Sequence, residues 1–330
     1  MLSSHILSIK DQKLNIQIRP TLNLFIKKQF GMAVSSLFIE LADKGFVNYI
    51  NSYTEAGLIG TVVGGKLWKG QLAKSGFKLT VVDEITGLDN KSLKILNEIT
   101  EHCRATRTLQ TFASAEFEEV IDGGRYIVRE GMIELHVHTS FAFITASDNV
   151  LRNTYIKTLM SRCFCVNLTL SKDEAFQLKS AGRKINLEEI RSDIVDEIIL
   201  PAEVNMKLLG YMEKLSFVED NLGGYYMRAH DDMVRISAVY AYLNDRNTIN
   251  EEDIRKAIDL YPLHQIGFKQ VGMSENEIRV YMSCNGKTIK EIASIVGLAE
   301  RSVSKYLNML VNSGLVAKIG DRYYRKGMIS

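Results

Sequence analysis

The stretch at residues 79–84 constrains the fold of this chain more than any other. Aliphatic and β-branched residues from Leu79 to Val82 run directly into the acids Asp83 and Glu84. A short apolar run of this kind predicts a buried strand. Both acids then lie at the carboxyl end of the strand, where open α/β sheets bind ligands. In a phosphoryl-transfer site, one such acid holds Mg²⁺ and the other orients the attacking water. The alternative is that the acids only cap the next turn.

Composition limits the class of protein. A chain of 330 residues is long enough for one large and one small domain, or for two to three small ones. With 24% charged and 46% hydrophobic residues it is typical of a soluble globular protein. The net charge of +2 creates no overall basic field, so DNA binding must come from local clusters.

Cysteine usage and hydropathy exclude further classes. The 4 cysteines form no Cys-x-x-Cys pair, so zinc and a disulfide framework are both disfavoured, as expected in a reducing cytoplasm. Since no apolar run approaches ~18 residues, neither a membrane span nor a signal peptide is expected.

Residues 22–42 have the order of a phosphate-binding loop. A brief strand at 22–26 and a helix at 37–42 flank a loop in which Gly31 takes the inner glycine position and Ser35 the Mg²⁺-side hydroxyl. Val34, however, stands where such a loop has its lysine. As a nucleotide motif the segment therefore fails, and an ordinary strand–helix turn is the better interpretation.

Residues 57–72 predict a β-hairpin. The dipeptide Gly64-Gly65 suits a primed two-residue turn between two apolar runs. Lys66 and Lys69, close to Trp68, are then exposed. They are candidate DNA contacts, or a solvated hairpin edge on which lysines discourage pairing.

Four segments within residues 46–103 occur in an order and at a spacing found in a known family. They are Glu55-Ala-Gly-Leu58, Leu67-Trp-Lys-Gly-Gln-Leu-Ala73, Val81-Val-Asp-Glu84 and a helix at 91–101. Together they resemble the core of the minichromosome maintenance (MCM) proteins, the AAA+ replicative helicases of archaea and eukaryotes. The resemblance implies that the hairpin at 57–72 is a helicase-type insertion and that Asp83 and Glu84 form the acidic motif.

The resemblance extends to later segments. Residues 126–133 are similar to the family's second hairpin, which implies that Arg129 contacts DNA; a solvated arginine on a turn is the alternative. The core strand at 140–149 ends at the family's sensor asparagine, which is Asp148 or Asn149. Arg162 matches the arginine that reaches a neighbouring subunit's nucleotide. Residues 104–125 are unplaced.

Residues 172–258 are predicted to be mainly helical. A charged helical segment at 172–200 is followed by helices at 204–215 and 227–243. A last helix at 248–258 has Asn250 as N-cap and Asp253 as the capping-box acid. This part resembles the AAA+ lid, which implies that Arg228 is its sensor arginine. The alternative for Arg228 is an ion pair with a nearby aspartate.

Residues 274–327 have the pattern of a winged helix-turn-helix. Helices at 275–283, 288–297 and 300–310 precede a β-wing at 315–325. The last helix is expected in the major groove with Arg301, Ser304 and Lys305 outward. Nine Lys/Arg against five Asp/Glu over 274–330 leave a charge of +4, so basic charge is concentrated here. A protein-binding winged helix is the alternative.

The expected fold is an α/β protein with an AAA+ P-loop-type parallel sheet, helicase-type hairpin insertions, a helical lid and a C-terminal winged helix. The domains are residues 1–200, 201–266 and 267–330. The residues predicted are Asp83, Glu84, Asn149, Arg162 and Arg228 for catalysis; Gly31, Val34 and Ser35 for the cofactor; Asp83 and Ser35 for Mg²⁺; and Lys66, Lys69, Arg129, Arg301, Ser304, Lys305 and Arg322 for DNA.

The function this implies is DNA binding linked to replication, with ATP hydrolysis lost or impaired because Val34 replaces the lysine and the family's N-terminal domain is missing. The alternatives are an active ATP-dependent helicase and, more weakly, a winged-helix transcriptional regulator. ATP and Mg²⁺ are the cofactors if the site functions. DNA and other MCM or replication proteins are the expected partners of a cytoplasmic, nucleoid-associated monomer or weak oligomer. An archaeal or mobile-element origin fits this interpretation.

Overall fold

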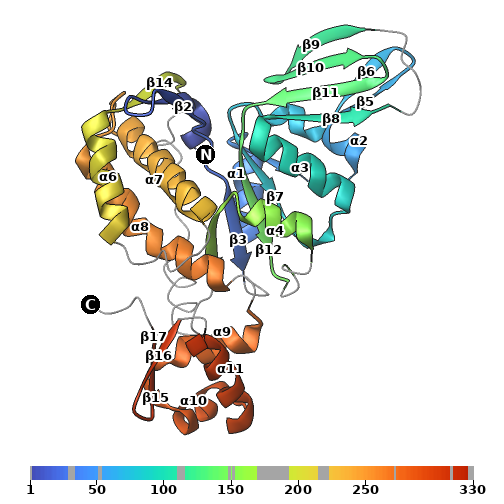
Figure 1. The fold of residues 1–330 in the computed structure, drawn as a ribbon. Coiled ribbons are helices and arrows are strands. Elements are labelled where there is room, and N and C mark those ends of the chain that lie inside the picture. The colour runs from blue at the N-terminus through green and yellow to red at the C-terminus, as the bar shows by residue number, and fades with distance from the viewer. Residues whose placement is uncertain are drawn as a thin grey trace.

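The computed structural model describes residues 2–28, 34–50, 54–109, 116–147, 150, 153–168, 193–214, 223–270, 273–312 and 315–325. Its centre is a five-stranded parallel sheet in the order β13-β3-β12-β7-β4 (Figure 1). The mixed α/β class and the parallel sheet are therefore confirmed. The strands are β3 (Leu24–Lys28), β4 (Val47–Ile50), β7 (Leu79–Val82), β12 (Ser140–Thr145) and β13 (Phe164–Leu168).

Helices cover both faces of this sheet because its central strands are apolar on both sides. All four residues of β7 and all six of β12 are buried, as expected for parallel strands. On one face, Phe141 and Phe143 pack with α3 and α4; on the other, Ala142 and Ile144 pack near α1. These helices are α1 (Val34–Asp43), α3 (Asn90–His102) and α4 (Thr154–Met160).

A second, antiparallel sheet contains the segment that sequence analysis left unplaced. Its order is β8-β11-β10-β9. The hairpin predicted at 126–133 is its centre, with a turn at Glu130 and Gly131 where φ is +48° and +73°. The strands are β8 (Arg104–Thr108), β9 (Phe117–Ile121), β10 (Gly124–Arg129) and β11 (Met132–Val137).

The hairpin predicted at 57–72 is also confirmed, in shorter form. Strands β5 (Gly60–Val63) and β6 (Lys66–Lys69) pair antiparallel, and positive φ angles at Gly64 and Gly65 make the primed turn. A short helix, α2 (Glu55–Leu58), precedes β5, and the 3-10 helices η2 (Gln71–Ser75) and η3 (Ile85–Gly87) flank β7.

Three helices and the first strands of the chain share another core. Strand β14 (Val195–Leu200) pairs parallel with β1 (Ile6–Asp11), which pairs with β2 (Ile16–Ile18). The prediction of helix up to residue 200 is therefore wrong for β14; residues 172–192 lie outside the described residues. The helices are α6 (Ala202–Lys214), α7 (Gly223–Leu243) and α8 (Glu251–Gln270), and η1 (Leu2–His5) packs on α7.

This core crosses the boundary predicted at residue 200. Ile6, Ile9 and Ile18 pack with Leu208 and Val234, so the first strands belong with the helices rather than with the parallel sheet. At the start of α8, Asn250 and Asp253 bond each other's backbone N–H groups at 3.1 and 3.0 Å, which confirms the predicted capping box.

The C-terminal unit, residues 273–325, is a winged helix with a hydrophobic core of its own. Its helices and wing are confirmed, while the strand β15, which completes the sheet β15-β17-β16, was not predicted. The elements are α9 (Glu275–Ser283), β15 (Asn285–Thr288), α10 (Ile289–Val296), α11 (Glu300–Asn312), β16 (Val316–Ile319) and β17 (Arg322–Arg325).

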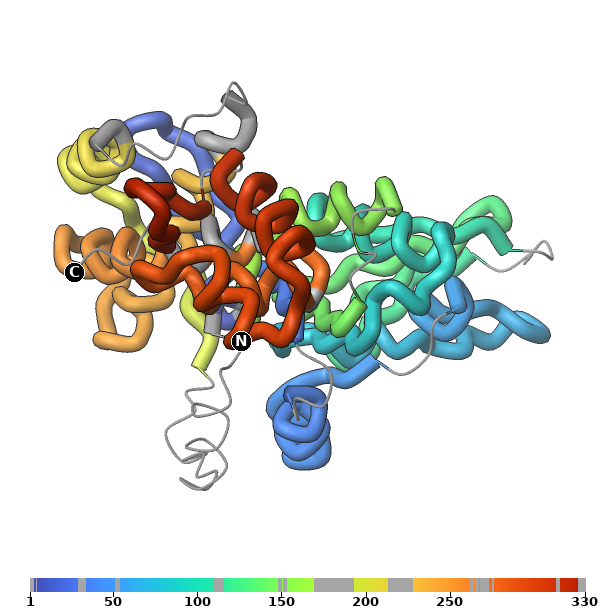
Figure 2. The backbone as a smooth tube through the Cα atoms, turned by 90° about the horizontal axis from the view of Figure 1, so that it is seen from below, coloured from blue at the N-terminus to red at the C-terminus, as the bar shows by residue number. Residues whose placement is uncertain are grey.

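The winged helix and the two hairpins lie at different ends of the molecule (Figures 1 and 2). The winged helix lies below the carboxyl edge of the parallel sheet, where the buried Lys27 Nζ donates to Met273 O at 2.5 Å. Among the described residues, none of the helices combines the length and apolar character that crossing a membrane requires.

Candidate nucleic-acid interface and the polar edge of the sheet

Helix α11 has one apolar and one polar face. Val303, Leu307 and Leu310 are buried in the core of the winged helix. At 100° per residue, the opposite face is a row of four exposed residues, two cations followed by two amides. This outward row is Arg301, Lys305, Asn308 and Asn312.

The cations of the outward row are free to bind phosphate. Within residues 273–312 and the other described ranges, neither Arg301 nor Lys305 forms an ion pair or a side-chain hydrogen bond. Ser304 is half-buried and lies beside the row, about 70° from the mean direction of its four members at 100° per residue. Asn308 and Asn312, which sequence analysis missed, follow from the same helical spacing once the buried face is known.

Local sequence defines both ends of α10. Thr288 Oγ1 accepts the N–H of Glu291 at 3.4 Å, and Glu291 accepts the N–H of Thr288 at 2.7 Å. Gly297 ends α10 in the left-handed region, with φ of +69°, and its N–H donates to Ala293 O. The tight turn between the helices therefore depends on a glycine at this position.

The wing carries Arg322, whose position is fixed by contacts with β15 and α10. Arg322 Nη1 donates to Gly286 O at 2.5 Å and lies 3.8 Å from Glu291 Oε2, while 49% of the side chain stays exposed. Lys318, also exposed, lies 5.7 Å from the centroid of the Tyr323 ring. The predicted contact Arg322 is thus positioned on the wing of the same unit as Arg301 and Lys305.

The other predicted DNA contacts lie far from this unit. Lys66 is exposed on the β5–β6 hairpin, and Arg129 is exposed at the end of β10. Lys69 Nζ is paired with Asp122 Oδ2 at 2.6 Å. The structure therefore divides the predicted contacts into two groups, at opposite ends of the view in Figure 1.

The predicted cofactor residues meet at the carboxyl edge of the parallel sheet. Lys28 Nζ donates to Ser35 Oγ at 2.5 Å and to Asp83 Oδ1 at 3.1 Å. Tyr49 Oη donates to Asp83 Oδ2 at 2.9 Å. Burial acts to raise the pKa of Asp83, but hydrogen bonds from Ser35, Tyr49 and Lys28 outweigh it and hold the pKa below its ordinary value.

A lysine of the chain bridges the two predicted Mg²⁺ ligands at this edge. An ammonium group lies between Ser35 and Asp83, the two predicted Mg²⁺ ligands. Val34 is in the first turn of α1 and offers no charge. As they stand, these described residues do not fit Mg²⁺. Gly31 and Asn149, also predicted here, lie outside the described residues.

Glu84 is held rigidly beside this cluster. Its backbone is left-handed, with φ of +54°. Its carboxylate accepts hydrogen bonds from Thr86 Oγ1 at 2.7 Å, Thr145 Oγ1 at 2.8 Å and Ala146 N at 3.3 Å. These contacts hold an unfavourable backbone conformation that costs on the order of 1–3 kcal/mol.

The two predicted catalytic arginines lie at the opposite, amino edge of the sheet. Arg162 precedes β13, donates to Asn97 Oδ1 at 3.0 Å and is paired with Glu101. Arg228 donates to Ser161 O at 2.9 Å. A five-residue strand, about 16 Å long, separates them from Asp83 and Glu84. The predicted catalytic set is therefore divided between two edges of this chain, because the arginine before a strand and the acid after one cannot share an edge.

A small ion-pair network surrounds these arginines. It lines a cavity of about 220 Å³. Arg235 forms ion pairs with Asp231 and Asp232. These aspartates therefore pair with Arg235 and not, as the alternative for Arg228 had it, with Arg228. Burial raises the pKa of Asp232, although Arg235 opposes the shift. The cavity is lined by Arg19, Arg162, Arg228, Arg235, Glu101, Asp231 and Asp232, among others.

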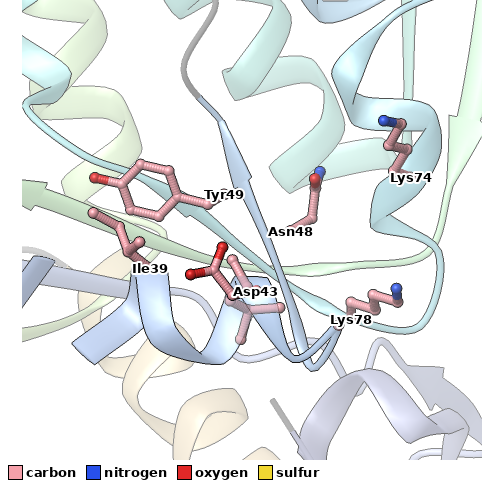
Figure 3. Close-up of a pocket in the computed structure, with 9 residues that line it drawn as sticks. Ile39, Asp43, Asn48, Tyr49, Lys74 and Lys78 are labelled. Atoms are coloured by element: carbon pink, nitrogen blue, oxygen red, sulfur yellow. The ribbon is translucent and has the colours of Figure 1, made fainter. Parts of the chain in front are cut away.

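A larger cavity, of about 520 Å³, borders strand β4 at the end of the sheet. Figure 3 shows Tyr49, Ile39 and Asp43 on one side and Lys74 and Lys78 on the other. Asp43, Lys74 and Lys78 give the lining of this cavity charges of both signs. The spacing of these residues in the sequence has no signal that sequence analysis could have used.

Comparison with known proteins gives one family. Residues 268–327 match the family "Sugar-specific transcriptional regulator TrmB". None of the curated proteins compared with the chain matches it. The matched segment coincides with the winged helix, and residues 1–267 have no match to MCM or AAA+ proteins.

The predicted membership of the MCM family is therefore wrong, and so are the predicted helicase and replication roles. The segments that suggested it are a Gly-Gly hairpin, a strand ending in acids and a capped helix. Each is a local solution to turn, burial and capping requirements that unrelated α/β proteins share. The weaker alternative, a winged-helix transcriptional regulator, is the one that the comparison supports.

Proposed function

We propose that this chain is a transcriptional regulator that binds duplex DNA through the outward row of α11 and the wing. The observation that carries the proposal is the match of residues 268–327 to a family of transcriptional regulators, on a unit whose exposed helix face carries two cations that pair with none of the described residues. A helix of this kind fits the major groove, and wing cations then reach the flanking phosphates.

The order of residues along α11 suggests that its cations and its amide contact different parts of the DNA. Arg301 and Lys305 offer positive charge for phosphate oxygens or guanine, while Asn308 offers the paired donor and acceptor that match adenine. Met309, 49% exposed, flanks this row and suits contact with a thymine methyl group. We therefore expect the bound DNA sequence to contain both G·C and A·T pairs, with an A·T pair opposite Asn308.

Fluorescence anisotropy with labelled duplexes selected from a random pool tests the proposal. Replacing Arg301 and Lys305 together by alanine should weaken binding and lower the salt slope by about two, since each phosphate contact contributes about 0.9. The matched control replaces Lys66 and Arg129, which are equally cationic but lie at the other end of the molecule, and should leave both quantities unchanged.

Specificity gives an independent readout. Asn308→Ala should cost about 1–3 kcal/mol for the selected site and abolish the preference at one base pair, with little effect on non-specific duplex. Unchanged affinity in the Arg301/Lys305 double variant, or loss in the Lys66/Arg129 control, would show that the interface lies elsewhere. Absence of any duplex binding would favour the protein-binding alternative.

A further inference from the structure

The cavity of about 520 Å³ beside β4 carries opposite charges on its two sides. Asp43, the last residue of α1, lies on one side, and Lys74 and Lys78 lie on the other (Figure 3). The C-terminal end of a helix carries partial negative charge, so the end of α1 adds to the charge of Asp43. The volume is in the range of pockets that hold small molecules.

Hydrogen bonds fix the backbone that carries the two lysines. Asn48 Nδ2, on β4, donates to Ser75 Oγ at 2.6 Å, which ties η2 and its Lys74 to the strand. The N–H of Lys78 donates to Ser75 O at 3.0 Å, and the carbonyl of Lys78 accepts from Thr139 Oγ1 at 2.7 Å. Both lysines are therefore held on ordered backbone, and only their side chains have to adjust to a ligand.

The three charged side chains of the cavity have no charged partner in the part of the chain that the structure describes. There, neither an ion pair nor a side-chain hydrogen bond engages Lys74, Lys78 or Asp43. A hydrogen bond from Lys69 lowers the pKa of Asp122, and the charges of Lys74 and Lys78 add to this shift. The carboxylate of Asp122 is paired with Lys69 Nζ at 2.6 Å, however. Two cations and one anion therefore leave the cavity with a net charge of +1.

Apolar side chains complete the lining. Val47 is buried in β4, Ala42 of α1 is half-buried, and Ile39 is 45% exposed. The carbon skeleton of a ligand gains free energy by covering such surface. The ring of Tyr49 also lines the cavity, and its hydroxyl donates to Asp83 Oδ2 at 2.9 Å, which fixes the position of the ring.

We propose that this cavity binds a small organic anion that also carries an ammonium or hydroxyl group. The anionic group, a carboxylate or a phosphate, contacts Lys74 and Lys78, and the donor group contacts Asp43. The net charge of +1 favours molecules with an excess of negative charge. The lining residues lie within residues 39–78, far along the chain from the winged helix, so this proposal and that of DNA binding can each fail alone.

Calorimetric titration of the full chain with four probes tests the inference. Glutarate carries two carboxylates, L-glutamate adds an ammonium group, glycerol 3-phosphate combines a phosphate with hydroxyls, and glycerol is the uncharged control. L-glutamate or glycerol 3-phosphate should bind with a Kd of about 1 mM or tighter, and the comparison of the two distinguishes a carboxylate from a phosphate. L-glutamate should bind about threefold or more tightly than glutarate, because only L-glutamate can donate to Asp43. Glycerol should show no saturable binding.

Variants locate the site. Lys74→Gln combined with Lys78→Gln should weaken binding of the anions about tenfold or more, because both ammonium groups are lost. Lys66→Gln combined with Lys91→Gln is the matched control, since it removes the same charge from two exposed positions elsewhere, and it should leave the Kd unchanged. Asp43→Asn should abolish the preference for L-glutamate over glutarate without weakening the binding of glutarate.

Each other outcome would overturn the proposal. Absence of saturable binding of all three anions at about 10 mM would do so, as would glycerol binding as tightly as glycerol 3-phosphate. An equal loss of affinity in the Lys66/Lys91 control would show that total charge, and not the cavity, controls binding. Should the Lys74/Lys78 variant fail to fold by circular dichroism, Lys74→Gln alone, at an exposed position, replaces it with an expected loss of about threefold or more.

Discussion

At the scale of single residues, His264 ties the helical unit to the parallel sheet. It lies on α8, and its Nδ1 accepts the N–H of Cys165 in β13 at 2.8 Å. The rings of Phe164 and Tyr261 lie 4.9 and 5.4 Å from its ring. Burial lowers the pKa of His264 from 6.5 to about 4. The native state therefore requires the neutral imidazole, whose Nδ1 accepts the Cys165 N–H.

The stability of the chain should consequently fall in mild acid. Between pH 6.5 and about 4 the unfolded state binds a proton at His264 that the folded state does not, so the free energy of unfolding decreases as pH falls through this window. The full contribution is present above pH 6.5, and its loss is on the order of 3 kcal/mol. Urea unfolding at several pH values measures it.

His264→Asn separates this residue from the other histidines. Asparagine keeps an acceptor for the Cys165 N–H but does not titrate, so the variant should lose part of the pH dependence between 6.5 and 4. His5 and His138 also have lowered pKa values because of burial, so they contribute to the pH dependence that remains. An unchanged pH profile in the variant would contradict the role given to His264.

At the scale of elements, a glycine sets how closely the two ends of the β5–β6 hairpin approach each other at its base. The N–H of Gly70 donates to Ile59 O at 3.2 Å and to Tyr126 Oη at 3.0 Å. A Cβ atom at Gly70 would lie 2.2 Å from Leu58 O. Gly70→Ala should therefore destabilise the chain by about 3 kcal/mol or more, because backbone and not a flexible side chain blocks the methyl group.

Gly87→Ala is the control for this prediction. A Cβ atom at Gly87 meets nothing within 4 Å, and its φ is not positive, so the free energy of unfolding should change by less than about 1 kcal/mol. Urea unfolding followed by circular dichroism compares the two variants with wild type. Equal effects at both glycines would show that helix or turn propensity, not close packing, controls the outcome.

At the scale of the whole molecule, the winged helix is a separate folding unit. Among the described residues, those that form its core all lie between Met273 and Tyr323. We expect residues 268–330 to fold alone and to bind the selected duplex within about tenfold of the full chain, a loss of no more than ~1.4 kcal/mol. Residues 1–267, which contain Lys66 and Arg129, should not bind that duplex specifically. A folded fragment 268–330 without affinity would place part of the interface elsewhere.

Local patterns in the sequence determined the elements whose partners are close along the chain. The Gly64-Gly65 turn, the Asn250–Asp253 capping box and the helices and wing of 275–325 all follow from periods and turn residues, and the structure confirms them. In the winged helix even the outward cations Arg301 and Lys305 could be named, since a buried face of period 3.6 defines the exposed one.

Only the tertiary structure decided the contacts that depend on distant pairing. Strand β14 was read as helix because its partner β1 lies about 190 residues earlier, at Ile6↔Val195. The direction of β13 placed Arg162 at the edge opposite to Asp83. The Lys28 ammonium came to lie where a metal was expected because three segments of the chain meet at that point. Charge and hydropathy along the sequence carry no information on which distant segment completes a site, and so the chemistry of the sheet edge became clear only once its strands were assembled.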